Sequence, residues 1–180
     1  MIDNETKLKI YMLIVSRYKQ SISEKEQKSI TEIRQRCSPY SDFIKKLKER
    51  LVGEVINYSY ENDFLHAVER VLDYARSIKN FELLIPFWMN FEEIDEIKAA
   101  SPIDKAVLIV ALLRVFGSES ARVFVTKSKR NYASFEYKEK KYIIIPESGS
   151  LLVGDDADKT IREDPLAYAF SDLLFESYED

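Results

Sequence analysis

Hydrophobic residues recur every three or four positions through most of the first 116 residues, which is the spacing of amphipathic helices. The segment from Pro102 to Phe116 departs from this pattern. It is apolar on nearly all sides, so we expect it to be buried in the middle of a domain. Ser101, Pro102 and Asp104 together form a strong signal for a helix start. The predicted helices cover residues 5–19, 23–36, 41–52, 62–79, 91–99 and 102–116.

Two of these helices carry a continuous apolar stripe. The stripe of the first, which makes that helix amphipathic, consists of Leu8, Tyr11, Met12, Val15 and Tyr18. The stripe of the fourth, which is predicted to be buried, consists of Phe64, Leu65, Val68, Val71, Leu72 and Ala75. The segment 81–89, which contains Pro86 and Trp88, is predicted to be irregular.

After Gly117 the pattern changes to the alternation of β-branched and aromatic residues that is typical of strands. Strands are predicted over 121–126, 132–137 and 142–145, with a polar turn at 138–141. Residues 155–164 are predicted to be an acidic loop, and 165–178 a terminal helix or a strand followed by a helix. Helices followed by an antiparallel sheet predict an α+β fold. We expect a basic helical extension over 1–50 and a core over 51–180.

The composition limits the chemistry that this chain can perform. Among 180 residues there is one cysteine, Cys37, and one histidine, His66, which excludes a disulfide scaffold and a zinc site built on thiolates. Neither of the Gly-rich phosphate-loop patterns occurs. We find no secretion signal and no long apolar run, so a cytoplasmic protein without membrane association is expected. The net charge of −4 divides into +5 over residues 1–50 and −9 over the rest.

Several motifs follow one another in the middle of the chain. They are Leu72-Asp73-Tyr74-Ala75-Arg76-Ser77-Ile78, Pro86-Phe87-Trp88, Ala100-Ser101-Pro102-Ile103-Asp104-Lys105-Ala106 with an apolar run to Arg114, and Gly117 to Val125. In this order they make residues 48–154 similar to the transglutaminase-like superfamily in its bacterial and archaeal form. The resemblance implies helices packed on a small antiparallel sheet, related to the papain-like cysteine proteases. It also implies that the family's catalytic Cys, His and Asp are replaced by Pro102, by Asn131 or Tyr132, and by Ile145.

The loss of all three groups predicts that the transglutaminase or peptidase reaction is absent. The resemblance then implies a catalytically inactive binding or scaffolding module. Its groove would lie between the start of the helix at Pro102 and the strands 132–137 and 142–145. A protein or peptide partner is expected, and neither a metal nor a cofactor. The residues predicted to line the groove are Trp88, Ser101, Asp104, Tyr132 and Tyr142.

Two other functions stay open at this point. A hydrolase or transferase with a relocated active site would use Ser101 as nucleophile and Lys105, about one helical turn away, as base. A nucleic-acid-associated protein would use the basic helices of residues 1–50 or the basic residues among the strands. The latter are Lys127, Lys129, Arg130, Lys138, Lys140 and Lys141.

Three further groups are interpreted as structural. Cys37 is read as a small, half-buried residue at a helix end, and His66 as a residue on the flank of a buried stripe. The acidic cluster of Asp155, Asp156 and Asp158 is compatible with a weak calcium site. Its spacing lacks the pattern of a calcium-binding loop, so a solvated loop is preferred.

Overall fold

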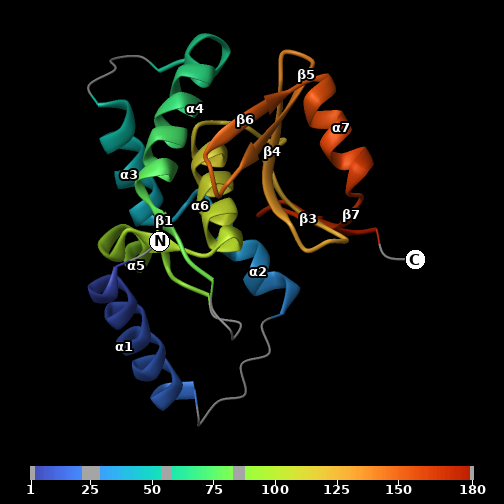
Figure 1. The fold of residues 1–180 in the computed structure, drawn as a ribbon. Coiled ribbons are helices and arrows are strands. Elements are labelled where there is room, and N and C mark those ends of the chain that lie inside the picture. Colours follow the sequence, from blue (N-terminus) through green and yellow to red (C-terminus); the bar gives the residue numbers. More distant parts are fainter. Residues whose placement is uncertain (1–2, 22–28, 54–57, 83–87, 179–180) are drawn as a thin grey trace.

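The computed structural model describes residues 3–21, 29–53, 58–82 and 88–178 (Figure 1). They form an α+β fold, as the sequence predicts. The helices are α1 Asn4–Ser21, α2 Ile30–Arg36, α3 Asp42–Val52, α4 Tyr60–Ser77, α5 Phe91–Ile97, α6 Pro102–Val115 and α7 Asp155–Glu163. The strands are β1 Lys79–Asn80, β2 Ala99–Ala100, β3 Arg122–Thr126, β4 Asn131–Tyr137, β5 Lys140–Ile145, β6 Ser150–Val153, β7 Leu166–Phe170 and β8 Phe175–Ser177.

Side-chain caps define the starts of α6 and α2. Ser101 Oγ accepts a hydrogen bond from the backbone N–H of Asp104 at 3.3 Å, as the sequence predicts. Ser29 and Glu32 form a capping box at the start of α2. The start predicted at Ser23 lies outside the described residues. Such caps satisfy backbone N–H groups that have no partner within the helix.

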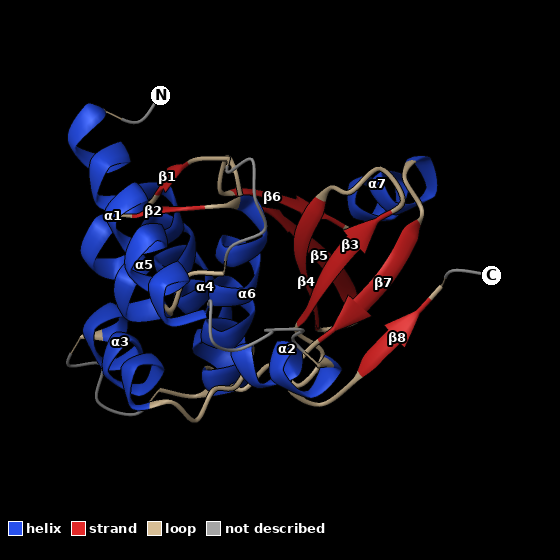
Figure 2. Cartoon of the chain, turned by 90° about the horizontal axis from the view of Figure 1, so that it is seen from below, coloured by secondary structure: helices blue, strands red, loops and turns tan. Residues whose placement is uncertain are grey.

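Helix α6 forms the centre of the main core. Every residue from Asp104 to Arg114 is buried, which confirms the expectation from its apolar sequence. Helices α3 and α4 and strand β4 pack around it, and Figure 2 shows the helices gathered on this side of the sheet. The same core includes Ile10, Ile44 and Leu47, so helices from residues 1–50 share it with the rest of the chain.

Helix α4 buries most of the apolar stripe predicted for it. Phe64, Val68, Val71, Leu72 and Ala75 are buried, whereas Leu65 is 38% exposed. The chain then forms β1, which pairs in parallel with β2. Within the segment predicted to be irregular, residues 83–87 lie outside the described residues.

The main sheet has the strand order β6-β5-β4-β3-β7-β8, and each strand is antiparallel to its neighbours. Helix α6 packs on one face, and α7 lies against the other (Figures 1 and 2). Successive side chains of a strand point to opposite faces. Accordingly, Ala133 and Phe135 of β4 belong to the main core, whereas Tyr132 belongs to a small second cluster with Ile143 and Ala157.

The segment predicted to be an acidic loop forms a helix instead. Residues 155–163 make up α7, and the side chain of Ala157 packs with Tyr132 and Ile143 on the second face of the sheet. The loop was predicted from the acidic residues of this segment, and three of the first four residues of α7 are aspartates. The prediction was wrong because these aspartates support a helix start. Aspartates in a first helical turn are favourable, since they face the positive end of the helix dipole.

The C-terminal segment is also corrected. Residues 166–177 form the strands β7 and β8, and the helix predicted there does not occur among the described residues. Strand β7 pairs with β3, with Val123 opposite Phe170. This pairing supplies backbone partners only after β3 has taken its place in the sheet, so the local pattern of residues 165–178 could not decide between helix and strand.

Helix α1 presents to water the apolar residues that its sequence marks as a stripe. Ile10 and Ile14 are buried, so α1 packs on the body through a different face. The side chain of Tyr18 lies outside the described residues. We call the exposed set the α1 stripe; it consists of Leu8 (58% exposed), Tyr11 (59%), Met12 (65%) and Val15 (58%).

Candidate functional site

The N-terminal end of α6 is the position at which the sequence places a groove. Ser101 Oγ donates a hydrogen bond to Asp104 Oδ2 at 2.7 Å, and it accepts one from the Asp104 N–H. Both bonds are those of a helix cap. The hydroxyl proton of Ser101 thus goes to a carboxylate, which is too weak a base to generate an alkoxide.

Lys105 follows in the first turn of α6 and is fully buried. Its Nζ donates to Ile78 O at 3.0 Å and to Asn80 Oδ1 at 2.9 Å, and Asn80 Nδ2 donates in turn to Glu147 O at 2.6 Å. Desolvation lowers the pKa of Lys105 to about 8. Nζ is directed to these two oxygens, while Ser101 Oγ is bonded to Asp104, so the two side chains do not form a nucleophile–base pair. The geometry gives Lys105 the role of joining α6 to β1 and to the β5–β6 turn.

The two faces of the sheet separate residues that the sequence assigns to one groove. Tyr142 stacks on Phe135 in the main core, with ring centroids 4.6 Å apart and planes inclined by 2°. Tyr132 and Ile145 belong to the second cluster, on the face that α7 covers. The structure therefore does not bring Tyr132 and Ile145 to the α6 side with Pro102. The strand period of two residues causes this, since Tyr132 and Tyr142 have opposite orientations in their paired strands.

Trp88 is half-buried beside the N-terminal helices. The guanidinium carbon of Arg36 lies 5.2 Å from the centroid of its ring, and Arg36 Nη1 donates to Met89 O at 3.0 Å. Arg17 of α1 donates to Trp88 O at 2.6 Å and forms an ion pair with Glu93. Contacts from α1 and α2 therefore hold this segment. A neighbouring hollow of about 290 Å³ is lined by polar residues of α2 together with Met89 and Phe91.

A larger hollow of about 460 Å³ lies between the start of α4 and the β4–β5 turn. The turn residues Lys138 and Glu139 have φ angles of 47° and 62°, although such turns favour Asn-Gly. Tyr137 Oη donates to the backbone O of Glu61 at 2.5 Å and fastens the hairpin to α4. The hollow is lined by the end of this hairpin and the start of α4. None of the residues predicted for the groove lines it.

Cys37 and His66 are held in different environments. Cys37 is completely buried, more than the sequence indicates, and burial raises the pKa of its thiol far above the usual value. His66 is exposed on α4, with Nδ1 3.5 Å from a carboxylate oxygen of Glu69. A thiolate–imidazole pair needs both groups in contact at an accessible site. The structure supports the structural interpretation of both residues.

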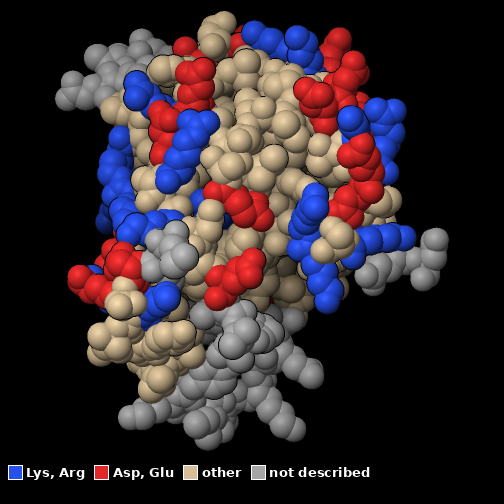
Figure 3. Space-filling model, viewed as in Figure 1, with Lys and Arg blue, Asp and Glu red and all other residues tan. Residues whose placement is uncertain are grey.

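Charged side chains of both signs are interspersed over the face drawn in Figure 3. Two basic residues of the sheet are paired with carboxylates: Lys141 with Asp158 at 2.7 Å and Arg122 with Glu176 at 3.0 Å. The bond from Lys141 holds the pKa of Asp158 below its usual range. Within the described ranges, no three His, Cys, Asp or Glu side chains are grouped to hold a metal ion.

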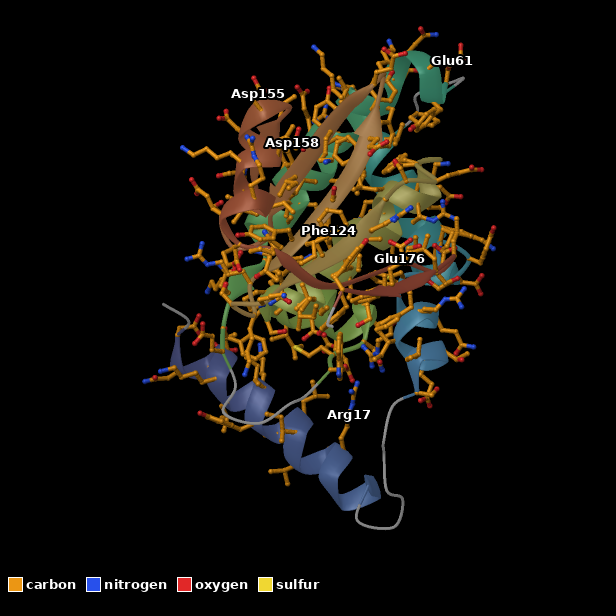
Figure 4. The ribbon with its side chains drawn as sticks, turned by 90° about the vertical axis from the view of Figure 1, so that its right-hand side faces the viewer. Arg17, Glu61, Phe124, Asp155, Asp158 and Glu176 are labelled. Carbon is orange, nitrogen blue, oxygen red and sulfur yellow. The ribbon has the colours of Figure 1, made fainter. Side chains whose placement is uncertain are left out.

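The α1 stripe is the surface feature that the sequence indicated as apolar but did not identify as exposed. Helix α1 is attached by Ile10 and Ile14, by the ion pair between Lys79 Nζ and Asp3 Oδ2 at 2.7 Å, and by Arg17. In Figure 4, Arg17 reaches from α1 toward the body of the molecule. These contacts fix one side of the helix, while the stripe faces water.

Comparisons of the chain with protein-family models, with curated proteins and with solved structures found no match. The part of the chain that the structure describes also contains no helix with the length and apolarity needed to cross a membrane.

Proposed function

We propose that this chain is a catalytically inactive, protein-binding module of transglutaminase-like architecture, and that it binds through α1. The observation that carries the proposal is the α1 stripe: four large apolar side chains, each more than half exposed, on one helical face. The largest exposed apolar patch of a monomeric protein is often the one through which it interacts.

The state of the candidate catalytic groups supports the inactive part of the proposal. The hydroxyl of Ser101 is used in the cap of α6, Lys105 donates to two oxygens, and the thiol of Cys37 is in the core. The order of elements around α6 also agrees with the transglutaminase-like resemblance: helix α4, the segment of Trp88, helix α6, and then three antiparallel strands.

The location of the stripe supports the binding part. A groove at the start of α6 would need Tyr132 and Tyr142 on one face, and they lie on two. By contrast, the members of the α1 stripe follow the spacing i, i+3, i+4 and i+7, so they form one surface two helical turns long. Residues at this spacing are the usual anchors of helix-mediated recognition between proteins.

A site-specific photo-crosslinker tests the proposal. We would place p-benzoylphenylalanine at position 12 and, as a control, at position 40, where Tyr40 is 72% exposed outside α1. The expected result is discrete protein adducts from position 12 and none from position 40. Each adduct would be identified by mass spectrometry and its affinity measured with purified proteins, with and without Met12→Lys. Absence of adducts at position 12, or an affinity that Met12→Lys leaves unchanged, would overturn the proposal.

A further inference from the structure

The α1 stripe has a spacing that is symmetric when the chain direction is reversed. Its residues are separated by three, one and three positions, so the order of intervals is the same from either end. In an antiparallel pair of these helices, Leu8 of each copy lies opposite Val15 of the other. Tyr11 of each copy likewise lies opposite Met12 of the other. Such self-complementarity is the requirement for a two-fold symmetric interface between identical chains.

We propose that the α1 stripe binds a second copy of this chain, with the two α1 helices antiparallel around a two-fold axis that passes between Tyr11 and Met12. This inference rests on the proposed function, because it names the partner of the same surface. Two turns of helix span about 10 Å along the axis. The contact therefore consists of the four stripe residues of each copy and the polar residues beside them.

The exposed area of the stripe is sufficient for a weak dimer. Four side chains of this size, more than half exposed, offer roughly 400–500 Å² on each copy. Two copies together would remove at most roughly 800–1,000 Å² from water, which is in the range of weak, transient interfaces. Interfaces of this size belong to weak, transient complexes, so we expect a reversible dimer with a dissociation constant on the order of 10–100 μM.

The charges next to the stripe favour the antiparallel arrangement. Lys7 is exposed on α1, and a parallel pair in register would set it against its own copy. The antiparallel pair sets Lys7 opposite Ser16, which is exposed and uncharged. It also sets the two helix dipoles side by side in opposite directions, so that the positive end of each helix lies next to the negative end of the other.

The position of α1 leaves room for this partner. In Figures 1 and 4, α1 lies at the edge of the molecule, with the body on one side of it. Ile10 and Ile14 mark the side toward the body, and the stripe residues point away from it. A second copy can thus approach the stripe without displacing the contacts by which Ile10, Ile14 and Arg17 hold α1 in place.

Sedimentation equilibrium of the full chain tests the inference between about 10 μM and 1 mM. The wild-type protein should approach twice its monomer mass as its concentration rises. Met12→Lys should weaken dimerisation about 100-fold or more, because it places an ammonium against an apolar surface. The matched control Tyr40→Lys should dimerise like the wild type, since Tyr40 is exposed outside α1.

The double variant Tyr11→Glu with Met12→Lys tests the geometry. In the antiparallel pair, the new carboxylate of each copy faces the new ammonium of the other, once on either side of the two-fold axis. The double variant should therefore dimerise about 3-fold or more tightly than Met12→Lys alone, whereas a parallel pair would oppose like charges and weaken it further. It should not reach the wild-type affinity, because two of the four stripe residues are no longer apolar. The altered side chains are exposed, and circular dichroism would check that each variant is folded.

A wild-type protein that stays monomeric at 1 mM, or a double variant that dimerises no more tightly than Met12→Lys, would overturn the inference. The crosslinks at position 12 separate this failure from that of the proposed function. Adducts with a different protein and none between copies would refute the dimer alone. If position 12 gives no protein adduct and the monomer binds vesicles of anionic phospholipid, both proposals fail.

Discussion

Helices α6 and α1 are both rich in apolar residues, and they differ in how much of their surface the rest of the protein covers. Every residue of α6 from Asp104 to Arg114 is buried, whereas α1 buries Ile10 and Ile14 and exposes its stripe. An apolar face indicates that something will cover it. The difference between the two helices shows that the covering surface can belong to the same chain or, as we propose for α1, to another molecule.

The largest effect should come from the buried ion pair that fastens α6. At the end of α6, Arg114 Nε lies 2.6 Å from Asp172 Oδ1, and both side chains are nearly inaccessible. Asp172→Ala should lower the free energy of unfolding by about 3–5 kcal/mol, because it leaves the buried Arg114 cation without its counter-charge and with the backbone O of Ser118 as acceptor.

The matched change at α1 is Lys79→Ala, which removes the exposed bond to Asp3 and leaves the hydrogen bond by which Asp3 caps α1 in place. It should leave the midpoint of urea unfolding unchanged, since solvent screens exposed ion pairs. Equal shifts for the two variants would contradict the comparison between a buried and an exposed attachment.

A second prediction compares the substitution of leucine by alanine at one position in each helix. Leu112 is fully buried in α6, and Leu8 is 58% exposed in α1. Leu112→Ala should cost about 3 kcal/mol of unfolding free energy through lost burial and a residual cavity. Leu8→Ala should stay within about 0.5 kcal/mol when measured at a concentration where the chain is monomeric. Urea titrations of both variants give the values, and a loss at Leu8 similar to that at Leu112 would show that the stripe is part of the fold's own core.

The smallest predicted effect concerns Lys105 and pH. Its pKa is about 8 in the folded protein against 10.5 for the ordinary side chain, so the folded protein loses this proton first as the pH rises. The unfolded chain then binds more protons, and stability should increase by about 1–2 kcal/mol between pH 8 and pH 9.5. Lys105→Met should remove this increase, whatever its effect on absolute stability. A pH profile that is the same in the variant would assign the increase to other groups.

The start of α6 shows which part of the candidate site was predictable. Ser101 and Asp104 form the predicted cap, because both partners lie within one helical turn and the bond depends on local geometry alone. The predicted groove depended on the orientation of Tyr132, and a change of one position in strand assignment moves a side chain to the other face of a sheet. In the structure, Tyr132 lies on the face of the sheet that α7 covers. The sequence pattern had not identified α7 as a helix.

The sequence by itself determined the elements whose signals are local: the capped start of α6, the burial of its apolar length, and the strands β3, β4 and β5 that follow it. Caps and the helical and strand periods act between residues a few positions apart, so they can be read along the chain. Only the tertiary structure decided that residues 166–177 extend the sheet, that α7 covers its second face, and that α1 turns its stripe to water. The physical reason is that each of these outcomes depends on which apolar surfaces and unpaired strand edges the rest of the fold leaves available, and that is a property of the assembled chain.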